Sequence, residues 1–183
     1  RQEPDGVMVG EMRDVETAQT GIQASLTGHL VLSTVHTNSA VAAITRLRDM
    51  GIESFLLASS LRTVISQRLV RRLCLSCKKE ELPSKNSTKL FNLDTNKKVF
   101  TSSGCDDCSN TGYQGRIAIA ECIQVDKTLK EMIHNNASEN LISEHVFKNN
   151  QSIDEASSEL ISKGITSCEE LIRINNLQEN ASI

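Results

Sequence analysis

Residues 7–14 read VMVGEMRD, and residues 27–38 read TGHLVLSTVHTN. Each stretch is a short apolar run followed by polar residues, which is typical of a buried parallel strand that ends at a turn. In open α/β sheets the carboxyl ends of neighbouring parallel strands meet at one edge, where ligands bind. We therefore expect Glu11, after the first strand, and His36, after the second, to face the same crevice. Taken alone, Glu11 is also compatible with a solvated residue in a turn.

The segments after these strands have helical patterns. Residues 14–28 place apolar side chains at helical spacing, with Asp14 as the expected cap. Residues 39–51 predict a second helix, with Asn38 as cap and Gly51 as stop. Residues 53–73 predict a third helix that runs into a short strand near Arg68–Leu73. This order of elements predicts an α/β domain with a largely parallel sheet.

The second half of the chain is less regular. Residues 74–108 are rich in Lys, Ser, Asn and Thr and suggest an insertion-like loop. RIAIAECI, at 116–123, predicts a strand, and four short helical patterns follow between residues 126 and 174. Gly164 followed by Thr166 and Glu169 suggests a helix stop and a capping box. The final residues, 175–183, predict a solvated tail.

Composition excludes several classes of protein. The 183 residues carry a formal net charge of −3, so no overall field favours nucleic acid or an anionic membrane. No stretch approaches the roughly 20 apolar residues of a membrane span. The first residues, RQEPDG, show neither an initiator Met nor a signal peptide, and suggest a chain that begins within a domain. Six cysteines without a secretory signal favour metal or packing roles over disulfides.

Four of these cysteines occur as two C-x2-C knuckles, CLSC at 74–77 and CDDC at 105–108. Two such knuckles can bring four thiolates onto one Zn²⁺. We expect Cys74, Cys77, Cys105 and Cys108 to bind a structural Zn²⁺, because four protein ligands leave no open position for water. Four unligated thiols are the alternative. Cys122 and Cys168 are expected to be packing residues.

Two histidines bracket the LVLSTV strand. A straight strand separates His29 from His36 by roughly 23 Å, so the two cannot share one metal. His36 follows the strand with Thr34 and Thr37 beside it, where it could sense a phosphate or orient a water. His29 precedes the strand, and we expect it to make a structural hydrogen bond. The arginines between residues 46 and 72 are compatible with solvated faces and equally with an anion or subunit contact.

Residues 1–61, the segments QRLVRRLC (67–74) and TGYQGRIAIAE (111–121), and the two knuckles closely resemble the bacterial secretion ATPases. The resemblance is strongest to the type II (general secretory pathway) assembly ATPases, and type IV pilus extension ATPases are similar. It implies a RecA-like P-loop motor that assembles as a homo-hexamer and docks on secretion platform proteins of the inner membrane. ATP hydrolysis would drive pseudopilus or pilus assembly.

The resemblance also implies roles for individual residues. VMVGEMRD is similar to the Walker B segment, with Glu11 polarising the attacking water near Mg²⁺. Gly10 stands where general P-loop enzymes place an Asp, as it does in this family. TGHLVLSTVHTN resembles the family's histidine box. The resemblance thus implies catalytic roles for Glu11 and His36, and a place near the nucleotide or Mg²⁺ for Gly10, Arg13, His29, Thr34 and Thr37.

The family's phosphate loop, G-x-x-x-x-G-K-[ST], does not occur in these 183 residues. We therefore expect this chain to be a C-terminal portion of the motor that does not bind ATP by itself in the family's manner. Residues 1–73 would belong to the RecA-like core, 74–115 to a tetracysteine zinc subdomain, and 116–183 to a strand and a small helical region.

The resemblance implies a cytoplasmic protein, peripheral at the bacterial inner membrane, without a transmembrane segment or a nucleic-acid partner. Two other classes remain as alternatives. One is a zinc-stapled interaction module in which the Walker B segment is inactive. The other is a zinc-ribbon nucleic-acid binder, which the negative net charge and the scarcity of aromatic residues disfavour.

Overall fold

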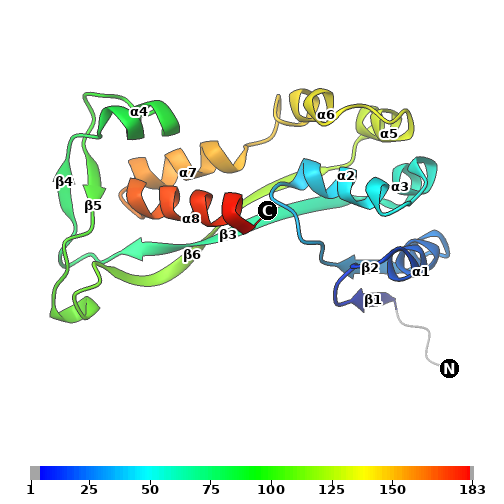
Figure 1. Ribbon diagram of the computed structural model, residues 1–183, viewed down its shortest axis with the longest axis horizontal. Coiled ribbons are helices and arrows are strands. Elements are labelled where there is room, and N and C mark those ends of the chain that lie inside the picture. Colours follow the sequence, from blue (N-terminus) through cyan, green and yellow to red (C-terminus); the bar gives the residue numbers. More distant parts are fainter. Residues whose placement is uncertain (1–4, 182–183) are drawn as a thin grey trace. The chain divides into compact units, whose positions relative to one another are not determined.

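The computed structural model describes residues 5–181, which form two compact units that interleave along the chain (Figure 1). Unit 1 comprises the residues up to Ser66 together with Cys122–Asn150, and unit 2 comprises Gln67–Glu121 and the residues from Gln151 onward. Two of the three boundaries lie within β3 (Thr63–Leu73) and β6 (Tyr113–Gln124), which pair in a two-stranded sheet. The three continuous segments expected from the sequence do not coincide with these units.

Unit 1 begins with the predicted strand, helix and strand, but the strands are not buried as expected: Met8, Leu30 and Leu32 are 76%, 61% and 57% exposed. β1 (Gly6–Val9) and β2 (Leu30–Ser33) are parallel, with Val9 opposite Ser33. α1 (Val15–Leu26) starts at the predicted cap, because the Asp14 side chain accepts the Thr17 N–H at 2.8 Å. α2 (Ala40–Asp49) starts one residue later than expected. Its cap is Ser39 rather than Asn38, and Ser39 Oγ accepts the Ala42 N–H.

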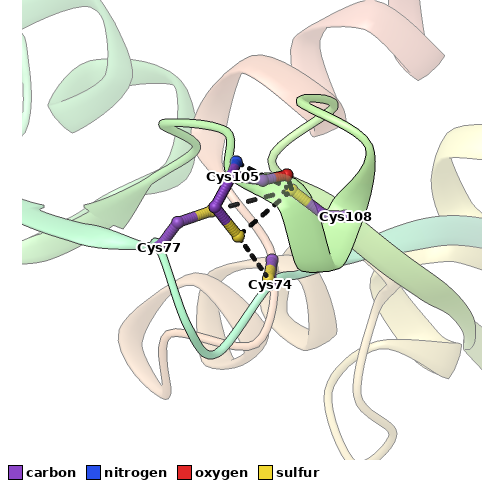
Figure 2. A group of neighbouring side chains, drawn as sticks. All are labelled: Cys74, Cys77, Cys105 and Cys108. Carbon is purple, nitrogen blue, oxygen red and sulfur yellow. Dashed lines mark hydrogen bonds between the residues drawn. The ribbon is translucent and has the colours of Figure 1, made fainter.

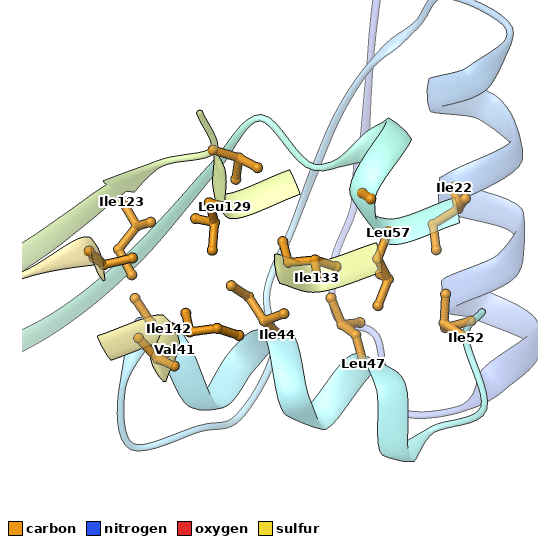
Figure 3. Close-up of a cluster of buried hydrophobic side chains, with 14 of the residues drawn as sticks. Ile22, Val41, Ile44, Leu47, Ile52, Leu57, Ile123, Leu129, Ile133 and Ile142 are labelled. Carbon is orange, nitrogen blue, oxygen red and sulfur yellow. The ribbon is translucent and has the colours of Figure 1, made fainter. Parts of the chain in front are cut away.

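The core of unit 1 is built by helices from both of its stretches of chain. α3 (Ser54–Ser60), α5 (Lys127–His134) and α6 (Glu139–Val146) complete the unit, and α3 contacts α5 while α2 contacts α6. Apolar residues recur at helical spacing on each of these helices, so each presents one face to the core. Figure 3 shows the resulting cluster, whose fully buried members include Ile44, Leu57, Ile123, Leu129, Ile133 and Ile142.

Unit 2 contains a folded region where an insertion-like loop was expected. β4 (Lys79–Glu81) and β5 (Val99–Thr101) form an antiparallel pair, and α4 (Lys85–Phe91) lies between them in the chain. A short 3₁₀ helix, η1 (Asp106–Cys108), follows. The expectation was wrong because Phe91 and Val99, which lie in a largely polar stretch, are buried in a core with residues of β3, β6, α7 (Ile153–Ser162) and α8 (Cys168–Ala181).

The turn from α7 to α8 confirms the predicted stop but not the predicted cap. Gly164 has φ +63°, and the Phe100 ring occupies the space that a Cβ would need. Thr166 Oγ1 donates instead to Arg71 O. Ser167 caps α8 in its place, because its Oγ accepts the Glu170 N–H. α8 continues through Asn175–Ala181, where a solvated tail was expected, and residues 182–183 lie outside the described part.

The sheets are smaller and less uniform than the sequence suggests. Among the described residues β1–β2 is a parallel pair and β4–β5 an antiparallel one, and each belongs to a separate two-stranded sheet. β3 starts at Thr63 rather than near Arg68. Within residues 5–181, none of the helices has the length and apolar character needed to cross a lipid bilayer.

Candidate functional sites

The residues that follow β1 and β2 are joined by hydrogen bonds. Thr34 Oγ1 donates to Gly10 O at 2.7 Å, and the Met12 N–H donates to Thr34 O at 2.9 Å. These bonds extend the parallel register beyond the last strand residues, Val9 and Ser33. The turns that carry Glu11 and His36 are therefore held side by side, as the sequence predicts for the carboxyl edge of two parallel strands.

Glu11 is the centre of this strand-tip site. Its Oε1 lies 2.8 Å from His36 Nε2, and its Oε2 accepts a hydrogen bond from Arg13 Nε at 2.6 Å and lies 2.6 Å from Arg13 Nη2 in an ion pair. The Glu11 side chain is 21% exposed, whereas those of Arg13 and His36 are 76% and 87% exposed. A carboxylate that is held between two potential cations is available as an acceptor for a water molecule.

Two of the other predicted residues lie in different surroundings. Thr37 Oγ1 donates to Ser39 O, at the start of α2. His29 Nδ1 lies 3.1 Å from Ala24 O and 3.2 Å from Thr27 Oγ1, which is the structural contact expected for this residue. His29 also lines a cavity of about 500 Å³ beside β2, whose lining includes neither Glu11 nor His36. The structure does not bring His29 into the Glu11 contacts.

The four knuckle cysteines converge on one point. Figure 2 shows Cys74 and Cys77 on the turn after β3, facing Cys105, which precedes η1, and Cys108, the last residue of η1. All four Sγ atoms lie within 4.8 Å of one another. The Cys74–Cys105 pair is 3.9 Å apart, and the Cys77–Cys108 and Cys105–Cys108 pairs are each 3.8 Å apart. A tetrahedral site with Zn–S bonds of about 2.3 Å separates its sulfurs by about 3.8 Å, so this donor set fits Zn²⁺.

Backbone N–H groups stabilise the thiolate form of one of these sulfurs. Burial raises the pKa of Cys108, but the N–H groups of Cys105 and Gly112 donate to its Sγ at 3.3 and 3.2 Å, and the pKa falls to about 6. Burial raises the pKa of Cys105 to about 12, and the Cys77 and Cys108 sulfurs add to that rise. A metal ion favours the thiolate form of every ligand, and Cys108 is the ligand that the backbone already favours in that form.

The sequence analysis missed a buried charge cluster in unit 2. Glu170 is fully buried and accepts hydrogen bonds from Arg71 and from Arg173. Burial raises the pKa of Glu170, but the donors on Arg173 and Arg71 outweigh this effect and lower the pKa to about 2. The Arg71 guanidinium also lies 4.0 Å from the centre of the Tyr113 ring. The three-residue spacing of Glu170 and Arg173 on one helix predicts their ion pair from the sequence. No pattern in the sequence predicts the contact of Glu170 with Arg71.

Solved structures show which class of fold this is. The pilus retraction motor PilT, solved with bound ADP, matches with a TM-score of 0.62 at 24% identity, over 91% of this chain and 38% of that chain. The ATPase DotB of Legionella pneumophila matches with a TM-score of 0.62 at 20% identity, over 95% of this chain and 39% of that chain. The chain therefore has an α/β fold of the kind found in these ATPases.

The chain belongs to the family described as Type II/IV secretion system protein, which matches residues 1–173. It is 51% identical over 178 residues to the type II secretion system ATPase E of Vibrio cholerae, covering 95% of this chain and 35% of that protein. It is 48% identical over 177 residues to the type II secretion system protein E of Aeromonas hydrophila, with the same coverage. The chain thus spans about 35% of the length of these relatives.

Proposed function

We propose that this chain forms the C-terminal portion of an ATP-hydrolysing motor of type II protein secretion, which drives pseudopilus assembly. In this proposal unit 1 supplies part of a RecA-like core, and unit 2 carries a zinc subdomain and helices. The observation that carries the proposal is the contact between Glu11 Oε1 and His36 Nε2 at the tips of two parallel strands. The similarity to type II secretion proteins supports the choice of pathway.

Glu11 has the chemistry of a water-polarising residue. In ATP hydrolysis a water oxygen forms a bond to the γ-phosphorus, the bond to the β–γ bridging oxygen breaks, and ADP and phosphate are released. Glu11 would accept the hydrogen bond from that water and draw off its proton. His36, Thr34 and Thr37 would lie on the side of the γ-phosphate, with Gly10 and Arg13 in the surrounding shell. His29, at the opposite end of β2, lies outside this shell.

The nucleotide needs further residues. Mg²⁺, when bound, would neutralise charge on the phosphates, and Glu11 is the carboxylate of this site that could face it directly or through a water. The sequence of this chain has no Gly-Lys-Ser/Thr loop to cradle phosphates. The phosphate loop would therefore be contributed by polypeptide outside these 183 residues.

The four-cysteine cluster would hold a structural Zn²⁺, a proposal supported by the sulfur separations. We further propose that the complete motor is a homo-hexamer that works in the cytoplasm, peripheral at the inner membrane, and docks on the secretion platform proteins. These assignments come from the secretion family to which the chain belongs.

The proposal is tested by Glu11→Gln in the full-length protein, with phosphate release and nucleotide binding measured in parallel. We expect ATP to bind as in the wild type while hydrolysis is lost, because the amide cannot draw a proton from water. Glu16→Gln, at an exposed position in the first turn of α1, is the matched control and should leave turnover unchanged. Wild-type turnover in Glu11→Gln would refute the assignment.

A second candidate is a motor for type IV pilus extension, because the sequence also resembles those ATPases. Complementation separates the two candidates: the gene should restore protein secretion in a strain without its type II ATPase, and should not restore pili in a strain without its extension ATPase. The opposite result would favour pilus assembly. A zinc-stapled interaction module remains as a further alternative, supported by the cysteine cluster, and it predicts no effect of Glu11→Gln on hydrolysis.

A further inference from the structure

The side chain of Arg13 turns back onto Glu11, two residues earlier in the chain. Its Nε donates to Oε2 at 2.6 Å, and its Nη2 forms an ion pair with the same oxygen, also at 2.6 Å. With 76% of its side chain exposed, Arg13 is not forced into this position by packing. The position is instead set by the charge-assisted hydrogen bonds to Glu11, which are roughly twice as strong as bonds between neutral groups.

The two oxygens of Glu11 are therefore unequal. A carboxylate can accept about four hydrogen bonds, about two at each oxygen. Arg13 donates from Nε to Oε2 and its Nη2 lies equally close to that oxygen, so the guanidinium covers Oε2, whereas the neighbour of Oε1 is His36 Nε2. Oε1, the oxygen beside His36, is therefore the less crowded acceptor.

The backbone keeps this arrangement in register. Met12, between Glu11 and Arg13, is bound through its N–H to Thr34 O, and Gly10 O accepts the Thr34 hydroxyl. Residues 10–13 are thus fixed against the segment that leads to His36. What remains free is rotation of the Glu11 carboxyl group, which would exchange Oε1 and Oε2. The paired donors of Arg13 oppose that rotation.

We propose that Arg13 is a positioning residue for the hydrolytic water: by occupying Oε2, it makes Oε1 the oxygen that accepts the water's hydrogen bond, next to His36. This inference rests on the proposed function and deepens it at the same site. Arg13 acts through Glu11 and does not itself touch the water. It therefore contributes to the orientation of the water relative to the γ-phosphorus, which is a contribution to kcat.

The test uses Arg13→Gln and Arg13→Lys in the full-length protein, with kcat and KM for ATP measured separately. Loss of a residue that orients a reacting group typically costs about 10- to 100-fold, so we expect Arg13→Gln to lower kcat by about that factor with KM unchanged. Arg13→Lys should recover part of the loss, because lysine keeps the charge but not the paired planar donors. Arg116→Gln, at an exposed position on β6, should leave both constants unchanged.

A double variant tests whether Arg13 acts through Glu11. Any slow hydrolysis that remains in Glu11→Gln should not fall further when Arg13→Gln is added, because the effect of Arg13 passes through the carboxylate. Wild-type kcat in Arg13→Gln, or a raised KM with unchanged kcat, would overturn the positioning role while leaving Glu11 as the water-polarising residue. An additional loss in the double variant would overturn it as well. If Glu11→Gln itself keeps full turnover, the proposed function fails instead.

Discussion

Glu170 and Arg71, separated by 99 residues in the chain, are joined by three hydrogen bonds. The Arg71 backbone N–H donates to Oε1 at 3.0 Å, and Nε and Nη2 donate to Oε2 at 2.8 and 2.6 Å. The Glu170 carboxylate, at 0% side-chain exposure, is thereby anchored to β3, just ahead of the first knuckle. This contact fastens α8 to the strand that leads into the cysteine cluster.

Glu170→Gln should destabilise unit 2. The neutral amide loses charge-assisted bonds and leaves Arg71 and Arg173 without their shared carboxylate, at a cost of about 2–3 kcal/mol. Arg71 and Arg173 are 39% and 47% exposed, and water therefore limits the penalty. Chemical unfolding should show this loss of stability in Glu170→Gln. The control Glu169→Gln, at the exposed neighbouring position, should be as stable as the wild type. Equal stability of both variants would contradict the role of the cluster.

The same carboxylate predicts a dependence of stability on pH. The pKa of Glu170 is lowered from its ordinary value of 4.5 to about 2 in the folded chain, so between these values the unfolded chain binds more protons. Its contribution to stability is complete above about pH 4.5 and is lost as the pH falls toward 2. Between about pH 5 and about pH 3, the free energy of unfolding should therefore decrease more in the wild type than in Glu170→Gln. Parallel acid profiles would refute this.

Loss of a knuckle sulfur should release the metal. Purified protein is expected to hold about one Zn²⁺ per chain, and Cys74→Ser should lower that content because it removes one of four ligands. Amide hydrogen exchange in residues 74–112 should accelerate, since metal binding contributes directly to folding. Unit 1 should keep its protection.

The matched control for the metal site is Cys122→Ser. Cys122 is exposed, lies outside the cluster, and should affect neither metal content nor exchange. If the wild-type protein contains no zinc after purification without a chelator, that result would argue against the metal site.

Asp126 joins two helices of unit 1. Its side chain caps α5 by accepting the Leu129 N–H at 2.6 Å, and it also lies 3.0 Å from His145 Nε2 on α6. Asp126→Ala should cost about 1 kcal/mol through the lost cap. Asp126→Asn can still cap but loses the charge that faces His145, so it should cost less. Thermal unfolding of the two variants measures the difference, and an equal loss would assign the whole effect to the ion pair.

Local patterns in the sequence were enough to predict much of unit 1. The cap at Asp14, the spacing of apolar residues in α1 and the polar residues after each strand involve near neighbours in the chain. The cap of α2 was misplaced by one residue because Asn38 and Ser39 are both good caps, and only the backbone decides between them. The side-by-side turns of Glu11 and His36 followed from the parallel pairing.

Unit 2 could be predicted less well because its contacts are distant in sequence. Phe91 and Val99 lie in short apolar pairs within a polar stretch, and the core partners that bury them come from distant segments, including the helices of the C-terminal part. Glu170 looks like an exposed helix residue until Arg71 is placed beside it. The cysteine cluster is the exception, since the spacing within each C-x2-C pair already limits which sulfurs can meet.

The interleaving of the two units limits how this chain can be divided. A truncation that ends after β6 would remove α5 and α6 from unit 1 and α7 and α8 from unit 2, so neither hydrophobic core would be complete. The cysteine knuckles would survive such a cut, but Val70 and Ile119 would lose the helices that cover them. Recombination between related motors would preserve both cores only when crossovers keep matched stretches together, so this region is expected to be exchanged and inherited as one block.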